Sequence, residues 1–154
     1  MKLDFMLEAI KMAKKSGKDI PIGAVIVKDG KIISKAVNER EKRQNTIYHA
    51  EMLAIRRACK KLGNWRLNDC EMYVTIEPCP MCASAILQAR LKSIYFGGFD
   101  MLNGAFGSKS NMSEIMGYPI NIKGGIMEKE CSEIITNYFE KLRKWLKNNS
   151  MNMH

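Results

Sequence analysis

The chain has 154 residues, the length of one ordinary domain with a substantial buried core. Lys and Arg number 25 against 16 Asp and Glu, and the net charge of +9 fits a polyanionic partner and a solvated basic surface equally well. No apolar run approaches about 18 residues and no signal-peptide pattern is present, so we expect a cytoplasmic protein without a membrane segment. The five cysteines are an odd number, which does not favour a disulfide framework.

The first third of the chain predicts a helix and a β-hairpin. Apolar residues recur at helical spacing over residues 2–15. Residues 22–28 are rich in β-branched side chains and predict a buried strand. Asp29-Gly30 favours a tight turn, so residues 32–37 should return antiparallel to that strand. The polar segment that follows, residues 38–48, is interpreted as a loop.

The middle of the chain alternates helices with strands. The expected elements are, in order, a helix at residues 49–62, a strand at 71–76, a helix at 79–89, a strand at 93–96, a short helix near 110–116 and a strand at 120–126. Such an alternation implies parallel strands joined by right-handed crossovers. Together with the hairpin it predicts an α/β fold, a three-layer α/β/α sandwich with a central mixed five-stranded sheet.

The C-terminal segment predicts a long helix followed by a tail. The helix should start near Glu128, because acidic side chains are favourable at a helix N-terminus. Its far end is basic, with Lys141, Arg143, Lys144 and Lys147. We expect one domain over residues 1–147 and a disordered tail at residues 148–154.

Two clusters of functional side chains stand out, His49-Ala50-Glu51 and Pro78-Cys79-Pro80-Met81-Cys82. One imidazole and two thiolates suit zinc, and three protein ligands leave a fourth position open for water. Glu51 is not needed as a ligand, and its carboxylate suits proton transfer. The combination of H-x-E with P-C-x-x-C is the signature of the zinc-dependent nucleobase deaminases. The sequence therefore predicts a catalytic zinc domain with the ligands His49, Cys79 and Cys82 and the catalytic residue Glu51.

Both clusters are expected at helix starts. Cys79 and Cys82 are three residues apart, so in a first helical turn they share one face. Pro80 fits there, because the N–H groups of a first turn have no helical partner anyway. Side chains of a first turn lean back past the helix end, so His49 and Glu51 could reach one point. Two helix N-termini aimed at the metal would also favour thiolate over thiol.

Other interpretations of the two clusters remain open. A structural zinc site would need a fourth ligand. The remaining candidates are poorly placed along the chain, and they are Cys59, Cys70, Cys131 and His154. A redox Cys-x-x-Cys pair is a further alternative. The same ligands would also serve a deaminase of a free base or nucleoside, such as guanine, cytosine or cytidine. The alternative of another class is a non-catalytic, zinc-stabilised RNA-binding protein.

Further segments extend the pattern of the two clusters. They are Pro21-Ile22-Gly23-Ala24-Val25, Asn38, Tyr73-Val74-Thr75-Ile76-Glu77-Pro78-Cys79, Asp100 and Gly104-Ala105-Phe106-Gly107-Ser108. With them, the chain closely resembles the bacterial tRNA-specific adenosine deaminases of the cytidine-deaminase-like superfamily, over roughly residues 5–145. Two positions depart from the family pattern. Asn45-Thr46-Ile47-Tyr48 stands where the family often has Asp-Pro-Thr-Ala, and Leu102 stands where a basic residue is common.

The resemblance implies a reaction and a set of functional residues. The residues are His49, Cys79 and Cys82 for one Zn²⁺ per chain, Glu51 for proton transfer, and Asn38, Ala50 and Asp100 for the substrate. Asn38 would hold the target nucleotide, the backbone of Ala50 would contact the purine edge, and Asp100 would lie beside the nucleotide. The implied reaction is hydrolytic deamination of adenosine to inosine in tRNA, at the anticodon wobble position. The expected assembly is a homodimer that binds a tRNA anticodon stem-loop.

Overall fold

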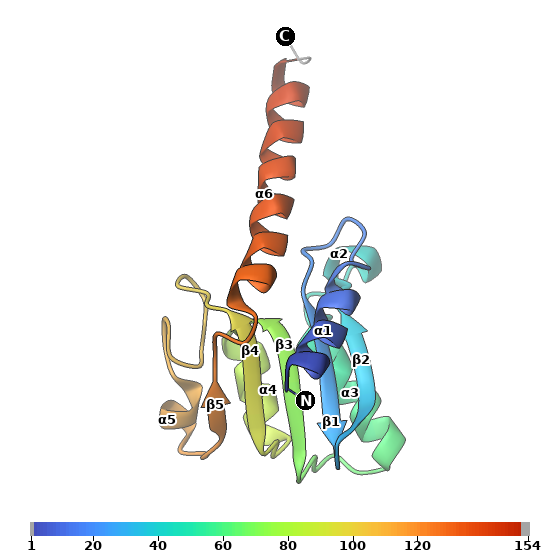
Figure 1. The fold of residues 1–154 in the computed structure, drawn as a ribbon, viewed down its shortest axis with the longest axis vertical. Helices are drawn as coiled ribbons and strands as arrows, with labels where there is room; N and C mark the ends of the chain where they lie inside the picture. The colour runs from blue at the N-terminus through green and yellow to red at the C-terminus, as the bar shows by residue number, and fades with distance from the viewer. Residues whose placement is uncertain (1, 152–154) are drawn as a thin grey trace.

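The computed structural model describes residues 2–151, which form a three-layer α/β/α sandwich (Figure 1). The strands are β1 (Gly23–Lys28), β2 (Lys31–Val37), β3 (Cys70–Ile76), β4 (Ser93–Gly98) and β5 (Asn121–Lys123). The helices are α1 (Lys2–Ala13), α2 (Arg40–Arg43), α3 (Ala50–Leu62), α4 (Pro80–Gln88), α5 (Met112–Met116) and α6 (Glu128–Met151). Helix α1 and the start of α6 cover one face of the sheet, and α3 and α4 cover the other. The predicted fold class is confirmed.

The sheet has the strand order β2-β1-β3-β4-β5, with β1 antiparallel to both neighbours and β3, β4 and β5 parallel. The predicted hairpin is confirmed, and Asp29 (φ 51°) and Gly30 (φ 73°) adopt the left-handed backbone that its turn needs. Strands β3 and β4 pair in parallel, as predicted. Strands β2 and β3 run in the same direction but are not neighbours, because β1 lies between them.

Side chains of the central strands alternate between two buried faces. On β1, Ala24 and Ile26 pack toward α3 and α4, whereas Val25 and Val27 pack toward α1 and α6. Tyr73 of β3 belongs to the second group, where it stacks on a neighbouring tyrosine. Helices cover both faces, which is why most side chains of these strands are apolar and buried. The two cores fix the central strands and hold their ends in place.

Several boundaries differ from the prediction. The segment 38–48 contains the short helix α2 and is not only a loop. Strand β5 is shorter than residues 120–126. Helix α6 continues through Met151, so residues 148–151 are helical where a disordered tail was expected. The rest of that tail lies outside the described residues. No glycine or proline interrupts α6, and the helix therefore has no local stop signal.

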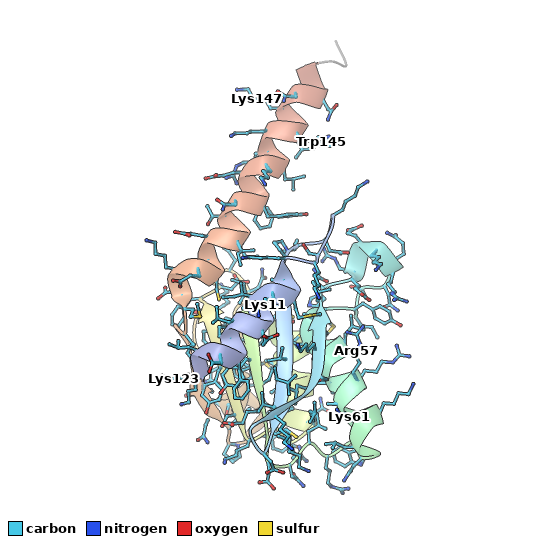
Figure 2. The ribbon with its side chains drawn as sticks, turned by 45° about the vertical axis from the view of Figure 1, so that its right-hand side comes forward. Lys11, Arg57, Lys61, Lys123, Trp145 and Lys147 are labelled. Atoms are coloured by element: carbon cyan, nitrogen blue, oxygen red, sulfur yellow. The ribbon has the colours of Figure 1, made fainter. Side chains whose placement is uncertain are left out.

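The second half of α6 projects beyond the sheet and the other helices (Figure 1). Figure 2 shows Trp145 and Lys147 on this projecting part. Its apolar side chains are uncovered, with Trp145 61% exposed and Leu146 51% exposed. None of the described helices is both long and apolar enough to span a membrane.

Several chain segments that matter for function begin or end along one edge of the sheet, the edge formed by the ends of the strands and not by an outer strand. Strands β3 and β4 end there, and β1 starts there because it is antiparallel to β3. Helix α4 follows β3 directly at this edge. The backbone N–H of Glu39, just after β2, donates to the carbonyl of Tyr48 at 3.0 Å, which brings the start of α3 to the same edge. Ligands of α/β folds gather at the carboxyl ends of strands, so this edge is the place for a site.

Candidate active site

Helix α3 begins at the sequence His-Ala-Glu. His49 is the N-cap residue, with an extended backbone (φ −70°, ψ 153°), and Ala50 is the first helical residue. The His49 side chain makes no capping hydrogen bond. The imidazole is therefore available to groups beyond the helix end, as the spacing predicted.

Helix α4 begins in the same way at the second cluster. Cys79 is its N-cap residue, with an extended backbone (φ −73°, ψ 172°), and a proline occupies the first turn. Cys82 is fully buried, and Cys79 is half-buried. Both thiols thus lie at the positive end of α4, where a helix favours the thiolate form.

Three potential ligand atoms converge between the two helix starts. Nδ1 of His49 lies 3.7 Å from Sγ of Cys79 and 3.5 Å from Sγ of Cys82. Ligand atoms of a tetrahedral zinc lie roughly 3.6 Å apart, because Zn–S bonds are about 2.3 Å and Zn–N bonds about 2.0–2.1 Å. The ligand atoms of the three residues all lie within 4.8 Å of one another. These separations fit a zinc ion held by one imidazole nitrogen and two sulfurs.

The other thiols lie elsewhere in the fold. The thiol of Cys59 donates to the carbonyl of Trp65 at 3.8 Å, and that of Cys131 to the carbonyl of Ile126 at 4.0 Å. Cys70 begins β3, at the opposite edge of the sheet. Within residues 2–151, the metal-binding group contains no fourth side chain. Such a donor set suits a catalytic zinc better than a structural one, which would need four protein ligands.

The thiols of the group differ in charge. A hydrogen bond from Cys82 lowers the pKa of Cys79 to about 4, while the same contact and burial raise the pKa of the Cys82 thiol. The hydrogen bond to Cys79 also raises the pKa of His49. Cys79 is therefore a thiolate at neutral pH, which is the form in which cysteine binds metal. Zinc binding would require Cys82 to release its proton as well.

Glu51 lies in the first turn of α3 and is 4% exposed. Burial raises the pKa of its carboxyl to about 7, and the neighbouring Cys79 contributes to the shift. A carboxylate that only complemented the helix dipole would do so from a solvated position. A buried carboxyl with a pKa near 7 can instead accept and release a proton at neutral pH, as a general acid–base group must.

Asn38 holds the chain segment that leads to His49. Its Nδ2 donates to the carbonyl of Ile20 at 3.2 Å, and its Oδ1 accepts from the backbone N–H of Arg40 at 3.2 Å. The Glu39–Tyr48 backbone hydrogen bond places Asn38 close to the start of α3. Asn38 thus lies near the start of α3, and its amide is already hydrogen-bonded within the protein.

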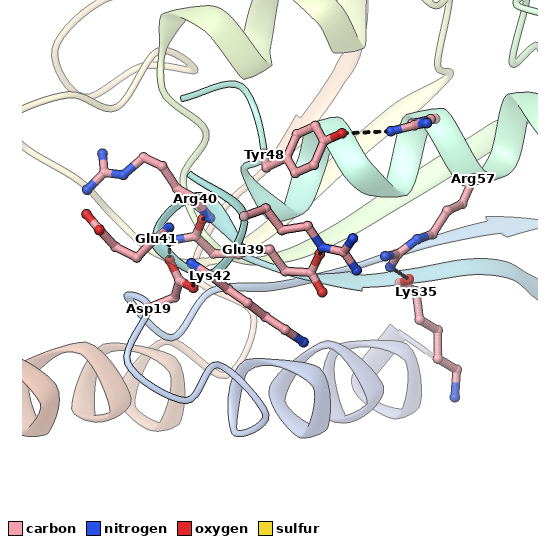
Figure 3. Close-up of polar contacts among 11 residues, drawn as sticks. Asp19, Lys35, Glu39, Arg40, Glu41, Lys42, Tyr48 and Arg57 are labelled. Carbon is pink, nitrogen blue, oxygen red and sulfur yellow. Dashed lines mark hydrogen bonds and ion pairs between the residues drawn. The ribbon is translucent and has the colours of Figure 1, made fainter. Parts of the chain in front are cut away.

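Asp19 fixes the same segment from the other side (Figure 3). Its carboxylate is 2% exposed and accepts from the backbone N–H groups of Glu41 and Lys42, at 2.6 and 3.0 Å. The hydroxyl of Tyr48 accepts from the guanidinium of Arg56 at 3.0 Å. The segment 38–48 is therefore held at its short helix and again where it enters α3.

Ala50 and Asp100 complete the predicted residues at this edge. Ala50 is fully buried at the start of α3. Oδ1 of Asp100 accepts from the backbone N–H groups of Leu102 and Asn103, both at 3.0 Å, so Asp100 shapes the turn after β4. The contacts of Asn38, Ala50 and Asp100 with a substrate stay predictions.

Sequence reasoning assigned no role to Glu77, although its side chain is central here. Glu77 follows the last residue of β3, stands two residues before Cys79 and is 3% exposed. Its carboxylate accepts hydrogen bonds from the loop that contains Asp100. The available signal was an acidic residue at the end of an apolar strand, directly before Pro-Cys.

The chain matches the family model described as the cytidine and deoxycytidylate deaminase zinc-binding region, over residues 1–98. It is 45% identical over 144 residues to the tRNA-specific adenosine deaminase of Bacillus subtilis (strain 168). That alignment covers 91% of this chain and 89% of the relative.

Solved structures give the same picture. One comes from a study of A-to-I editing by tRNA:A34 deaminases at the wobble position of transfer RNA. It aligns with a TM-score of 0.79 and 36% identity, covering 85% of this chain and 98% of its own. The guanine deaminase of Bacillus subtilis aligns with a TM-score of 0.61 and 42% identity, covering 62% of this chain and 63% of its own. The similarity to the editing enzyme therefore extends over more of both chains.

Proposed function

Because the chain belongs to the family defined by the cytidine and deoxycytidylate deaminase zinc-binding region, we propose that it hydrolytically deaminates adenosine to inosine in tRNA. The observation that carries this proposal is the convergence of His49, Cys79 and Cys82 beside the buried carboxyl of Glu51. The similarity to a tRNA-specific adenosine deaminase over most of both chains supports the choice of substrate.

The cofactor is Zn²⁺. Nδ1 of His49 and the sulfurs of Cys79 and Cys82 would hold it, because their separations match those of zinc ligands. When bound, zinc activates water as a nucleophile at neutral pH. Helices α3 and α4 fix the positions of the ligands, since His49 and Cys79 are their N-cap residues.

Glu51 moves the protons of the reaction. With a pKa of about 7, its carboxyl can take a proton from the attacking water and pass it to the ring nitrogen of the purine. The carboxylate then takes a second proton, from the hydroxyl that has added to C6, and gives it to the departing amino group. The amino group leaves as ammonia, so that the reaction consumes one water and releases one ammonia per adenosine. Burial keeps the carboxyl out of bulk solvent during these transfers.

The substrate we propose is the anticodon stem-loop of a tRNA, with the wobble adenosine as target. A base must leave its stack to reach the site, which costs about a few kcal/mol and least in an exposed loop. Asn38, the backbone of Ala50 and Asp100 would hold the nucleotide, since they lie at the same edge as the metal-binding group. Basic side chains could contact RNA phosphates, and Figure 2 shows Arg57 and Lys61 on α3 and Lys147 on α6.

A homodimer is part of the proposal. The outer surface of α3 and the segments beside it carry apolar side chains that the rest of the chain leaves partly or largely uncovered. They are Ile47, Met52, Ile55, Cys59 and Trp65, and we call them the α3 apolar face. A second copy of the chain packed here would bury this face close to His49.

A tRNA substrate would also place the protein in the cytoplasm.

A free-base deaminase is the second candidate, supported by the similarity to the guanine deaminase of Bacillus subtilis. The decisive experiment incubates the zinc-loaded protein with total tRNA, sequences the RNA for A-to-G changes, and in parallel measures ammonia release from guanine, cytosine and cytidine. We expect A-to-G changes at the first anticodon position and no ammonia from the free compounds. Ammonia from guanine without a change in tRNA would favour the second candidate, and no turnover of either kind would favour a non-catalytic RNA-binding protein.

A further inference from the structure

Glu77 has a carboxylate that one loop surrounds with donors. Oε1 accepts from the backbone N–H of Asp100 at 3.2 Å and from the hydroxyl of Ser108. Oε2 accepts from the backbone N–H groups of Phe106 and Ser108, both at 3.1 Å. A carboxylate has about four lone-pair sites, so these donors fill its capacity.

Within residues 2–151, no cationic side chain forms an ion pair with this carboxylate. The ion pairs among the described residues are Lys11–Glu8, Lys35–Glu8 and Arg43–Glu39, and none of them includes Glu77. A buried carboxylate must be paired or hydrogen-bonded, because burial of an uncompensated charge is costly. The stabilisation of the Glu77 charge therefore comes from the loop 100–108, and the loop is in turn held by that charge.

The backbone at Glu77 joins the loop to the metal-binding turn. The N–H of Glu77 donates to the carbonyl of Gly98 at 2.9 Å, and the carbonyl of Pro78 accepts from the N–H of Ala105 at 2.8 Å. Cys79, a zinc ligand in the proposed site, is the next residue. Glu77 and Pro78 thus connect the loop 100–108 to the metal-binding turn, through both side-chain and backbone hydrogen bonds.

Gly104 shows how closely the loop and the carboxylate approach. A Cβ atom at this position would overlap both the carbonyl oxygen of Asp100 and the carboxylate of Glu77. The backbone φ of Gly104 is not positive, so the glycine is needed here for space and not for a left-handed conformation. The absence of a side chain at Gly104 therefore leaves the space that the contact between Glu77 and the loop backbone requires.

We propose that Glu77 is a positioning residue, which fixes the loop 100–108 relative to the zinc ligands and so sets one wall of the nucleotide site. The effect on catalysis rests on the proposed function, because it is expressed through the substrate contact assigned to Asp100. The hydrogen bonds by which Glu77 holds the loop 100–108 do not depend on that assignment.

The test uses the zinc-loaded full chain and the substitution Glu77→Gln, which keeps the size of the side chain. A glutamine oxygen can accept from two donors, while its NH₂ group faces donors that it cannot satisfy. Amide hydrogen exchange, measured without RNA, should be faster by about tenfold or more at Phe106 and Ser108. The zinc content should stay at one ion per chain. Wild-type exchange rates at these amides would overturn the proposal.

Two variants accompany this measurement. Asp19→Asn is the matched control, because Asp19 is also buried and also accepts from two backbone N–H groups, those of Glu41 and Lys42 in the short helix α2. It should speed exchange at Glu41 and Lys42 and leave Phe106 and Ser108 protected. Ser108→Ala removes only the hydroxyl donor and carries the test if Glu77→Gln does not fold. Its exchange at Phe106 should be faster than in the wild type, and an unchanged rate would count against the role of Glu77.

Steady-state kinetics on an anticodon stem-loop separate positioning from chemistry. Glu77→Gln should raise KM by about tenfold and change kcat by less than about threefold, since the loop contributes binding and Glu51 keeps its place. Faster loop exchange with an unchanged KM would overturn the positioning role. A wild-type protein that does not turn over RNA would refute the proposed function, while the exchange result would still decide whether Glu77 tethers the loop.

Discussion

Nδ1 of His49 and Sγ of Cys82 lie 3.5 Å apart, although 33 residues of chain separate them. The approach depends on β3, which carries the chain from the end of α3 back to the edge where α3 starts. A metal bound at this point would join the starts of α3 and α4. Zinc is therefore expected to stabilise the fold as well as to serve the reaction.

Substitution of Cys82 by Ser should remove zinc and stability together. A serine hydroxyl is a poor zinc ligand, and the two remaining ligands would not hold the ion. By elemental analysis we expect less than about 0.1 zinc ion per chain. The Tm of the variant should be lower than that of the wild type by about 10 °C. Cys59→Ser is the control, because Cys59 bonds to Trp65 away from the site. Full zinc content in Cys82→Ser would contradict the ligand assignment.

Substitution of Glu51 by Gln should abolish turnover and leave the metal in place. The amide has nearly the size of the carboxyl but cannot shuttle protons, and general acid–base catalysis is worth about 10²–10⁴ in rate. The kcat for A-to-I conversion should fall by about that factor with one zinc per chain. Glu71→Gln is the control, since Glu71 accepts from Tyr95 at the opposite edge of the sheet. Turnover at the wild-type rate in Glu51→Gln would remove Glu51 from the mechanism.

The basic end of α6 should contribute to RNA affinity in a salt-dependent way. Lys147 lies on its projecting part (Figure 2), and Lys144 directly precedes Trp145, which lies there too. Both lysines are exposed and therefore accessible to RNA phosphates. Their joint replacement by Gln should weaken stem-loop binding and reduce the slope of log K against log salt concentration by about 1.5. Replacement of Lys31 and Lys92, exposed at the far edge of the sheet, removes the same charge as a control. Equal salt slopes for both pairs would exclude a specific contact by α6.

The α3 apolar face should hold two copies of the chain together. Trp65 belongs to this face and is 53% exposed, so Trp65→Ser should weaken self-association without emptying the core. Sedimentation should show a dimer for the wild type and a larger monomer fraction for Trp65→Ser. Trp145→Ser is the matched control, because Trp145 is 61% exposed on α6 and far from α3. A wild-type monomer at micromolar concentration would contradict the homodimer.

The positions of the proposed zinc ligands in the fold could be predicted because the signals for them are local. A histidine before Ala-Glu and a cysteine before Pro each begin a helix, and the structure has His49 and Cys79 as N-cap residues. The strands were predictable for a similar reason, since β-branched runs and the Asp29-Gly30 turn act over a few residues. These parts of the fold need no knowledge of distant contacts.

The rest depends on contacts that a sequence pattern does not contain. The place of β1 between β2 and β3 follows from which strand edges meet, and periodicity is silent on that order. The role proposed for Glu77 rests on donors from the loop 100–108, which lies more than 20 residues further along the chain. The length of α6 was underestimated because its last residues are polar, although no residue there stops a helix.

The position of β1 between β2 and β3 also determines when the metal-binding group can form during synthesis of the chain. A nascent chain that ends before β3 contains His49 and Glu51 but neither thiol ligand. The hairpin can form early from local contacts, whereas β3 must dock on its free edge before an imidazole and two sulfurs meet. Metal capture therefore cannot precede the synthesis of β3 and the two thiols, and a ribosome-bound fragment ending near residue 69 should fail to retain zinc.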